Sequence, residues 1–89
     1  MEFEFDPNKS AMNREKHGLD FVQAQAVWSD ENAINITSRE APELRFMAIG
    51  RIEAVLWSVV WTSKDGKRRI ISARRSRKDE EKLYEDARL

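Results

Sequence analysis

The chain has 89 residues, and its 16 lysine and arginine residues balance 16 aspartate and glutamate residues, so its net charge at neutral pH is zero. It has no cysteine and one histidine, which excludes disulfides, thiolate nucleophiles and zinc sites built from cysteine or from several histidines. The amino terminus is acidic and no apolar run approaches the roughly 20 residues of a membrane span, so we expect one soluble domain over residues 1–89, located in the cytoplasm.

The amino-terminal segment predicts a short strand followed by a helix. Residues 2–5, with the sequence EFEF, alternate between charged and apolar side chains as a half-buried strand does. Asp6 and Pro7 then provide an N-cap and a first helical position, and Gly18 is suited to end the helix in a left-handed conformation. We therefore expect the first helix to run from residue 7 to residue 16 or 17.

A second helix is predicted soon after this glycine. Asp20 is a suitable N-cap, and Gln23 three residues later completes the pattern of a capping box. The helix that follows presents apolar side chains on one face, namely Phe21, Ala24, Val27 and Trp28. Two short helices joined by a tight turn therefore precede the rest of the chain.

The middle of the chain predicts β-strands, since it is rich in β-branched and aromatic residues and is interrupted by Pro, Gly and Glu. Asp65 and Gly66 predict a type I′ hairpin between the last two strands, because that turn needs two positive φ angles. Both of these strands are apolar on both faces, so helices should cover one face of the sheet and a further element or a partner the other. The predicted strands cover residues 33–37, 44–50, 53–62 and 68–73.

Beyond the strands, the sequence predicts a carboxy-terminal helix that begins at Ser76, with Asp79 three residues later as its capping-box partner. Its apolar side chains are few, and we expect it to dock through Leu83, Tyr84 and Ala87. The predicted fold class is therefore α+β, with two short amino-terminal helices, an antiparallel sheet of three to four main strands and a carboxy-terminal helix.

Positive charge is concentrated in residues 64–78, KDGKRRIISARRSRK, which we call the basic stretch. It holds eight Lys and Arg and one Asp, for a charge of +7, while the other 74 residues hold 8 bases and 15 acids, for −7. On a regular strand, odd-numbered and even-numbered side chains lie on opposite faces. Arg69 and Arg74 should therefore point to opposite sides of the sheet unless a bulge lies between them.

The residue types in the basic stretch support two interpretations. Arginine binds phosphate oxygens through two N–H groups at once, so the stretch fits a nucleic-acid surface. Alternatively, its isoleucines belong to the core and its arginines reach water at the strand ends or pair with the acidic carboxy-terminal helix. In the first interpretation, the RNA-binding side chains are those of Lys64, Lys67, Arg68, Arg75, Arg77 and Lys78.

A second cluster consists of Asn13, Lys16 and His17, which share one face of the first helix because they are three and four residues apart. Histidine exchanges protons near neutral pH, and a neighbouring cation suits the cleavage of a phosphodiester. The same residues also suit a purely structural role, since cations at the C-terminus of a helix interact favourably with the helix dipole. Both roles stay open at the level of sequence.

Other candidate side chains stand singly. Arg45 lies beside Glu43 in an otherwise apolar strand, where it forms either a surface salt bridge or part of a cleft. Glu80 and Tyr84 are four residues apart on the last helix. In a structural role, Glu80 is a surface residue and Tyr84 docks the helix; in a catalytic role, Glu80 is an acid and Tyr84 a proton donor. No pair of carboxylates accompanies the histidine, so a nuclease of this sequence is predicted to need no metal and no cofactor and to use the 2′-hydroxyl of RNA as its nucleophile.

Four motifs occur in order between Phe3 and Tyr84: FEFDPNK, N..KHG..F..A..VW.D, E.RF...G and RRIISARR....E...Y. Together they resemble the BrnT-type toxins of bacterial type II toxin–antitoxin systems. The resemblance implies a RelE-like α+β fold, a ribonuclease activity that inhibits translation, and neutralisation by a cognate antitoxin. Two positions depart from the family pattern, since the hairpin turn reads SKDGK where Arg-Gly is usual and Phe5 stands where Trp is usual.

The resemblance also implies site residues and partners. The expected partners are an RNA substrate and a BrnA-like DNA-binding antitoxin. The protein would reach operator DNA only through this antitoxin. A homodimer within the complex is a further alternative. The competing hypothesis is a degenerate toxin that binds RNA or its antitoxin without cleaving. Arginines would stabilise charge on the phosphate and the other side chains would transfer protons; the expected catalytic residues are Lys16, His17, Arg45, Arg69, Arg74 and Tyr84.

Overall fold

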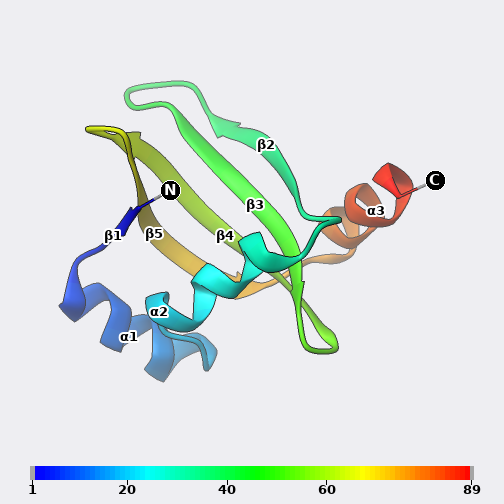
Figure 1. The fold of residues 1–89 in the computed structure, drawn as a ribbon, viewed down its shortest axis with the longest axis horizontal. Helices are drawn as coiled ribbons and strands as arrows, with labels where there is room; N and C mark the ends of the chain where they lie inside the picture. Colours follow the sequence, from blue (N-terminus) through cyan, green and yellow to red (C-terminus); the bar gives the residue numbers. More distant parts are fainter. Residues whose placement is uncertain (1, 89) are drawn as a thin grey trace.

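A computed structural model describes residues 2–88, which form a five-stranded sheet and three α-helices (Figure 1). The strands follow the order β1–β5–β4–β3–β2 across the sheet. None of the helices in residues 2–88 is long and apolar enough to cross a membrane. The elements are β1 (Phe3–Glu4), α1 (Pro7–His17), α2 (Phe21–Ala24), the 3₁₀ helix η1 (Gln25–Ser29), β2 (Ile34–Arg39), β3 (Arg45–Ile52), β4 (Val55–Lys64), β5 (Lys67–Arg75) and α3 (Lys78–Ala87).

The two amino-terminal helices begin where the sequence predicts. Asp6 caps α1 by accepting a hydrogen bond of 2.8 Å from the backbone N–H of Asn8, and Gly18 ends the helix with a φ of 83°. Asp20 and Gln23 form the expected capping box, in which each side chain accepts from the backbone N–H of the other. The second helix is shorter than the apolar pattern suggests, because it tightens into η1 after one turn.

The predicted hairpin between β4 and β5 is confirmed. Asp65 and Gly66 have φ angles of 52° and 76°, both in the left-handed region that a type I′ turn requires. Lys64 and Lys67 lie opposite each other at the base of the turn, and the two strands pair antiparallel from there. This hairpin places residues 67–75 of the basic stretch in the sheet as β5, which lies between β1 and β4.

The sheet is mixed and has five strands, which corrects the expected antiparallel sheet of three to four strands. β1 pairs parallel with β5, with Phe3 opposite Arg68 and Glu4 opposite Arg69. Parallel neighbours need a long connection, and here that connection is most of the chain. The pairing therefore depends on tertiary structure, which the local residue pattern of EFEF does not encode.

Each face of the sheet has its own apolar core. On one face, α1, α2 and η1 cover a core that includes Phe21 and Val27. On the other face, α3 covers a smaller core formed by Met47, Ile49 and Tyr84. The prediction that a further element covers the second face is thus confirmed, and that element is α3.

The start of α3 differs from the prediction by one residue. Its N-cap residue is Arg77 rather than Ser76, and the backbone N–H of Arg77 donates to the Glu80 carboxylate at 2.9 Å. Ser76 does not cap the helix, since its hydroxyl lies 2.8 Å from that of Ser58 on β4. The Ser76 hydroxyl is therefore engaged with Ser58 of β4, and the helix begins one residue later than predicted.

The expected docking of α3 was right for one residue of three. Tyr84 is buried, but Leu83 is 45 % exposed and Ala87 is also exposed. The second buried residue of the helix is Glu80, a charged side chain. Its burial is explained by the hydrogen bonds described below, which an apolar-periodicity argument does not consider.

Candidate nucleic-acid interface

A β-bulge interrupts β5 at Ile71. Between Val60 and Trp61, one step along β4 corresponds to two steps along β5, from Ser72 to Ile70, so Ile71 has no residue opposite. β3 pairs with the same part of β4 without any shift, so the extra residue belongs to β5. Beyond such a bulge, side chains lie on the face opposite to the one that alternation predicts.

The bulge places Arg69 and Arg74 on the same face of the sheet. Arg69 lies opposite Thr62 of β4, and Arg74 lies opposite Ser58. Residues directly opposite each other share a face, and Thr62 and Ser58 are four positions apart on a regular strand. Strict alternation would separate the two arginines unless a bulge intervened; the bulge is present, and both arginines emerge on the side of α3.

Three further predicted cations share this face. Arg45 stands two positions before Met47, which belongs to the core beneath α3. Lys64 stands two positions after Thr62, and Lys67 lies opposite Lys64. We call this group the arginine face; its members are Arg45, Lys64, Lys67, Arg69 and Arg74.

Three cations of the arginine face form partly exposed ion pairs with carboxylates. Ion pairs that water still reaches stabilise a protein by about 0–1 kcal/mol, so only a small free energy holds these cations to their carboxylates. The side chains of Arg69 and Glu4 are about one third exposed, at 34 % and 31 %. The pairs are Arg69 with Glu4 (3.3 Å), Arg45 with Glu43 (3.2 Å) and Lys67 with Glu2 (3.6 Å).

Arg74 is held more firmly than the other cations. Its Nη1 and Nη2 each donate a hydrogen bond of 2.7 Å to Glu80, one to each carboxylate oxygen. Burial raises the pKa of Glu80, but hydrogen bonds from Arg74, the Arg77 N–H and the Ser58 hydroxyl outweigh burial and hold that pKa at about 2. The hydrogen bonds that Arg74 donates to Glu80 raise the pKa of Arg74 itself. Glu80 therefore stays ionised and orients Arg74, rather than serving as a proton donor.

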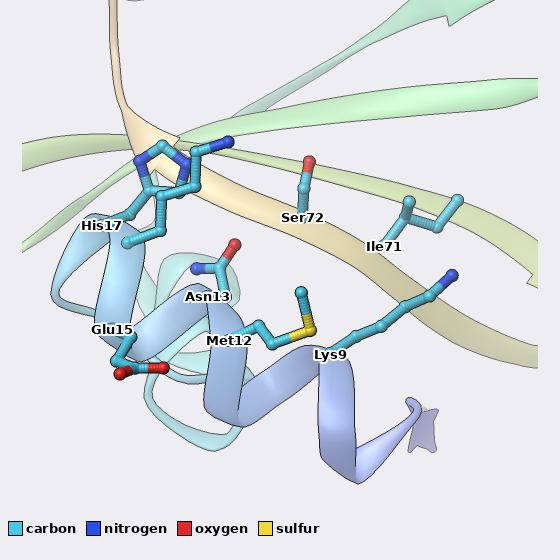
Figure 2. Close-up of a pocket in the computed structure, with 8 residues that line it drawn as sticks. Lys9, Met12, Asn13, Glu15, His17, Ile71 and Ser72 are labelled. Carbon is cyan, nitrogen blue, oxygen red and sulfur yellow. The ribbon is translucent and has the colours of Figure 1, made fainter.

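An open pocket of about 480 Å³ lies between α1 and β5, close to the bulge (Figure 2). Ser72 lies opposite Val60 of the core beneath α3, so the strand wall of the pocket belongs to the same face as the arginines. Lys16 and His17 both line the pocket, as the shared helical face predicts, but none of the arginines does. The lining residues are Lys9, Met12, Asn13, Glu15, Lys16, His17, Ile71 and Ser72.

Asn13 joins α1 to β5 by hydrogen bonds that sequence reasoning missed. Its Nδ2 donates to the carbonyl oxygens of Leu19 at 2.7 Å and Ala73 at 2.8 Å, and its Oδ1 accepts from the N–H of Ala73 at 3.2 Å. The side-chain amide of Asn13 thus makes the two hydrogen bonds to the backbone of Ala73 that a neighbouring strand would otherwise make at this edge of β5. The motif N..KHG contains this residue, but its partner is 60 positions away, which no spacing within the motif reveals.

Tyr84 lies in the core rather than at the site. It is 1 % exposed, and its hydroxyl donates to Asp30 Oδ2 at 2.7 Å. Burial and this hydrogen bond raise the pKa of the Tyr84 hydroxyl. Asp30 also accepts from the backbone N–H of Arg51 at 2.8 Å. Tyr84 therefore anchors α3 to the turn before β2.

The other predicted RNA-binding residues lie outside the arginine face. Arg68 is on the opposite face, where its guanidinium carbon lies 4.9 Å from the ring centroid of Trp28 and 5.4 Å from that of Trp61. Arg75 lies opposite Trp57 of the core beneath α1 and α2, so it also points to that side. Arg77 and Lys78 are exposed at the start of α3. The basic stretch is thus divided between two faces.

Within residues 2–88, no group of three or more His, Cys, Asp or Glu side chains is placed to hold a metal ion. The arrangement instead combines fixed cations with a half-buried histidine. Such a set of groups can bind a phosphodiester, stabilise additional negative charge on it and exchange a proton with it.

Comparison with protein-family models gives a match over most of the chain. A family model described as "Ribonuclease toxin, BrnT, of type II toxin-antitoxin system" matches residues 5–80, which is most of the 89-residue chain. The matched segment contains α1, the pocket and the whole of β5, and ends at Glu80. A search of curated proteins found no match.

Proposed function

Since the chain belongs to the BrnT family of ribonuclease toxins of type II toxin–antitoxin systems, we propose that it cleaves RNA without a metal ion and thereby inhibits translation. One observation carries the proposal, namely that the bulge at Ile71 brings Arg69 and Arg74 to one face beside the pocket of His17. The order of two helices, a sheet and a final helix also supports the inference that the fold is RelE-like.

The proposed reaction uses groups of the RNA and of the protein alone. The 2′-oxygen forms a bond to the adjacent phosphorus while the bond from phosphorus to the 5′-oxygen breaks, and the products end in a 2′,3′-cyclic phosphate and a 5′-hydroxyl. Of the two candidate proton-transfer groups, His17 accepts the proton of the 2′-hydroxyl, and the ammonium of Lys16 beside it can donate a proton to the 5′-oxygen as it leaves. Arg45, Arg69 and Arg74 stabilise the negative charge that grows on the phosphorane.

Glu80 has a defined part in this proposal. Its two hydrogen bonds keep the plane of the Arg74 guanidinium fixed, which removes a reorganisation cost when charge develops on the phosphate. Tyr84 has no part in it, since its hydroxyl is buried and donates to Asp30. The proton that reaches the leaving 5′-oxygen therefore comes from a group of the pocket or from water.

Incubation of the purified protein with single-stranded RNA in EDTA tests the proposal. We expect shortened products with 2′,3′-cyclic phosphate ends, and no cleavage of a 2′-O-methyl RNA of the same sequence, because its 2′-oxygen has no proton to lose. The His17→Ala variant should cleave more slowly. Cleavage that EDTA abolishes would contradict the metal-independent reaction, and intact RNA would contradict the nuclease.

A module that binds RNA or an antitoxin without cleaving is the second candidate function. The observation in its favour is that none of the arginines lines the pocket that contains His17. Such a module would retard RNA in a gel without shortening it, so the same incubation separates the two functions.

The family implies an antitoxin partner. We propose that this partner is a BrnA-like DNA-binding protein that covers the arginine face with acidic or apolar residues, and that the toxin reaches operator DNA through it in the cytoplasm. Co-expression with the antitoxin should restore growth that the toxin alone arrests. The molar mass of the purified complex then decides whether it contains two copies of the toxin.

A further inference from the structure

The cations of the pocket between α1 and β5 differ from those of the arginine face. Among residues 2–88, none of the nine salt bridges involves Lys9, Lys16 or His17. Arg69 and Arg74, by contrast, each have a carboxylate partner. The two lysines of the pocket, Lys9 and Lys16, are therefore available to an anionic ligand without any exchange of partners.

Two apolar side chains also line the same pocket. Met12 is 65 % exposed and lines the pocket together with the half-buried Ile71. Met12 belongs to neither core, so its side chain is available to a ligand. The thioether of methionine makes favourable contacts with aromatic rings, and it adapts to ligands of different shape.

Figure 2 shows how the two kinds of side chain are arranged. Ile71 and Ser72 project from β5 on the same side of the strand, and the amine of Lys9 extends along β5 near Ile71. The single carboxylate of the lining, that of Glu15, is directed away from β5. An anion beside Lys9 is therefore not faced by the one carboxylate among the residues that line the pocket.

We propose that the pocket between α1 and β5 is a nucleotide subsite of the RNA substrate, in which the base of one nucleotide lies on Met12 and Ile71 and its phosphate contacts Lys9. The volume of about 480 Å³ is within the range of small-ligand sites, about 300–1,000 Å³. Because His17 lines the same pocket, the nucleotide held there is adjacent to the bond that is cleaved. The assignment rests on the proposed function, and it adds Lys9 and Met12 to the residues that bind RNA.

Binding of a 2′-O-methyl oligoribonucleotide to the full chain at several salt concentrations tests the subsite apart from cleavage. Lys9→Ala removes one phosphate contact, so the slope of log K against log salt concentration should decrease in magnitude by about 0.7. Met12→Ala should weaken binding about two- to tenfold and leave that slope unchanged. With RNA as substrate, both variants should raise KM more than they lower kcat.

Matched controls come from exposed residues of other helices. Lys82→Ala on α3, whose side chain is 76 % exposed, controls for the loss of a surface lysine. Val22→Ala on α2, which is 63 % exposed, controls for the loss of a surface apolar group. Both controls should bind RNA as the parent chain does, and all four variants should keep its circular dichroism spectrum.

The possible outcomes separate the subsite from the proposed function. If the parent chain cleaves RNA while Lys9→Ala and Met12→Ala match their controls in slope, affinity and KM, the subsite is overturned and the function stands. If those variants lose affinity for the antitoxin but not for RNA, the pocket serves the protein partner and the subsite is again overturned. If the parent chain neither binds nor cleaves RNA, the proposed function fails together with the subsite.

Discussion

Arg74 and Glu80 are joined by two hydrogen bonds of 2.7 Å, one from each terminal nitrogen of the guanidinium to each oxygen of the carboxylate. They belong to different elements, since Arg74 is on β5 and Glu80 is in the first turn of α3. Glu80 is 7 % exposed and accepts two further hydrogen bonds. The pair therefore fixes both the helix and the arginine, and its loss should affect stability as well as activity.

Glu80→Gln should lower the free energy of unfolding by about 3 kcal/mol, because it leaves the Arg74 guanidinium partly buried without its counter-charge. Urea denaturation measures the change. Glu81→Gln is the matched control, since Glu81 is the next residue on α3 and is exposed. Equal midpoints for the two variants would show that the pair contributes little to stability.

The pH dependence of stability should report the same pair. The pKa of Glu80 in the folded chain, about 2, is below its ordinary value near 4.5, so the folded state binds this proton less tightly than the unfolded state does. The stabilisation is complete above pH 4.5 and is lost as the pH falls towards 2, with a size on the order of 3 kcal/mol. Denaturation curves of the parent chain and Glu80→Gln should converge across this interval; curves that stay parallel would contradict the assignment.

Arg69→Ala and Arg75→Ala compare the two faces of β5 directly. Arg69 is on the arginine face. Arg75 is exposed on the opposite face of the sheet, which α1 and α2 cover. Removal of one charge-stabilising donor typically costs about 100-fold in rate, so Arg69→Ala should lower kcat for RNA cleavage about 100-fold. Arg75→Ala should change it about twofold at most. Comparable losses for both variants would contradict the role of the bulge.

Glu4→Gln should strengthen RNA binding, because Glu4 pairs with Arg69 at 3.3 Å in the free protein. Phosphate and carboxylate compete for the same guanidinium, and this partly exposed pair stabilises the free protein by about 1 kcal/mol. The expected gain in affinity for 2′-O-methyl RNA is about two- to fivefold. Glu31→Gln is the control, since it makes the same change in net charge at an exposed position of the turn before β2. An equal gain in RNA affinity for this variant would show that net charge alone is responsible.

Asn13→Ala should destabilise the chain by about 2–4 kcal/mol, since it removes three hydrogen bonds and leaves backbone groups of Ala73 and Leu19 without partners. Hydrogen exchange of the Ala73 amide should accelerate more than that of amides in β4. Asn8→Ala, at an exposed position of α1, serves as the control. Unchanged protection of the Ala73 amide would show that another group closes the edge of β5.

Much of the local structure follows from residues that are close in the chain. Asp6, Asp20 and Gln23 fix the helix starts because capping bonds connect residues two or three positions apart. Asp65 and Gly66 fix the hairpin because they tolerate positive φ angles. The motifs around His17 and in the basic stretch indicated the family, which the family model confirms over residues 5–80.

The sequence by itself therefore determined the caps, the hairpin, the α+β class and the family, because each depends on short-range geometry or on residue identity. Only the tertiary structure decided which arginines share a face of the sheet. The bulge at Ile71 arises from the register of β5 against β4, and it moves Arg69 and Arg74 to one face while Arg68 goes to the other. Register is a relation between two strands, and residue alternation within one strand gives no information about it.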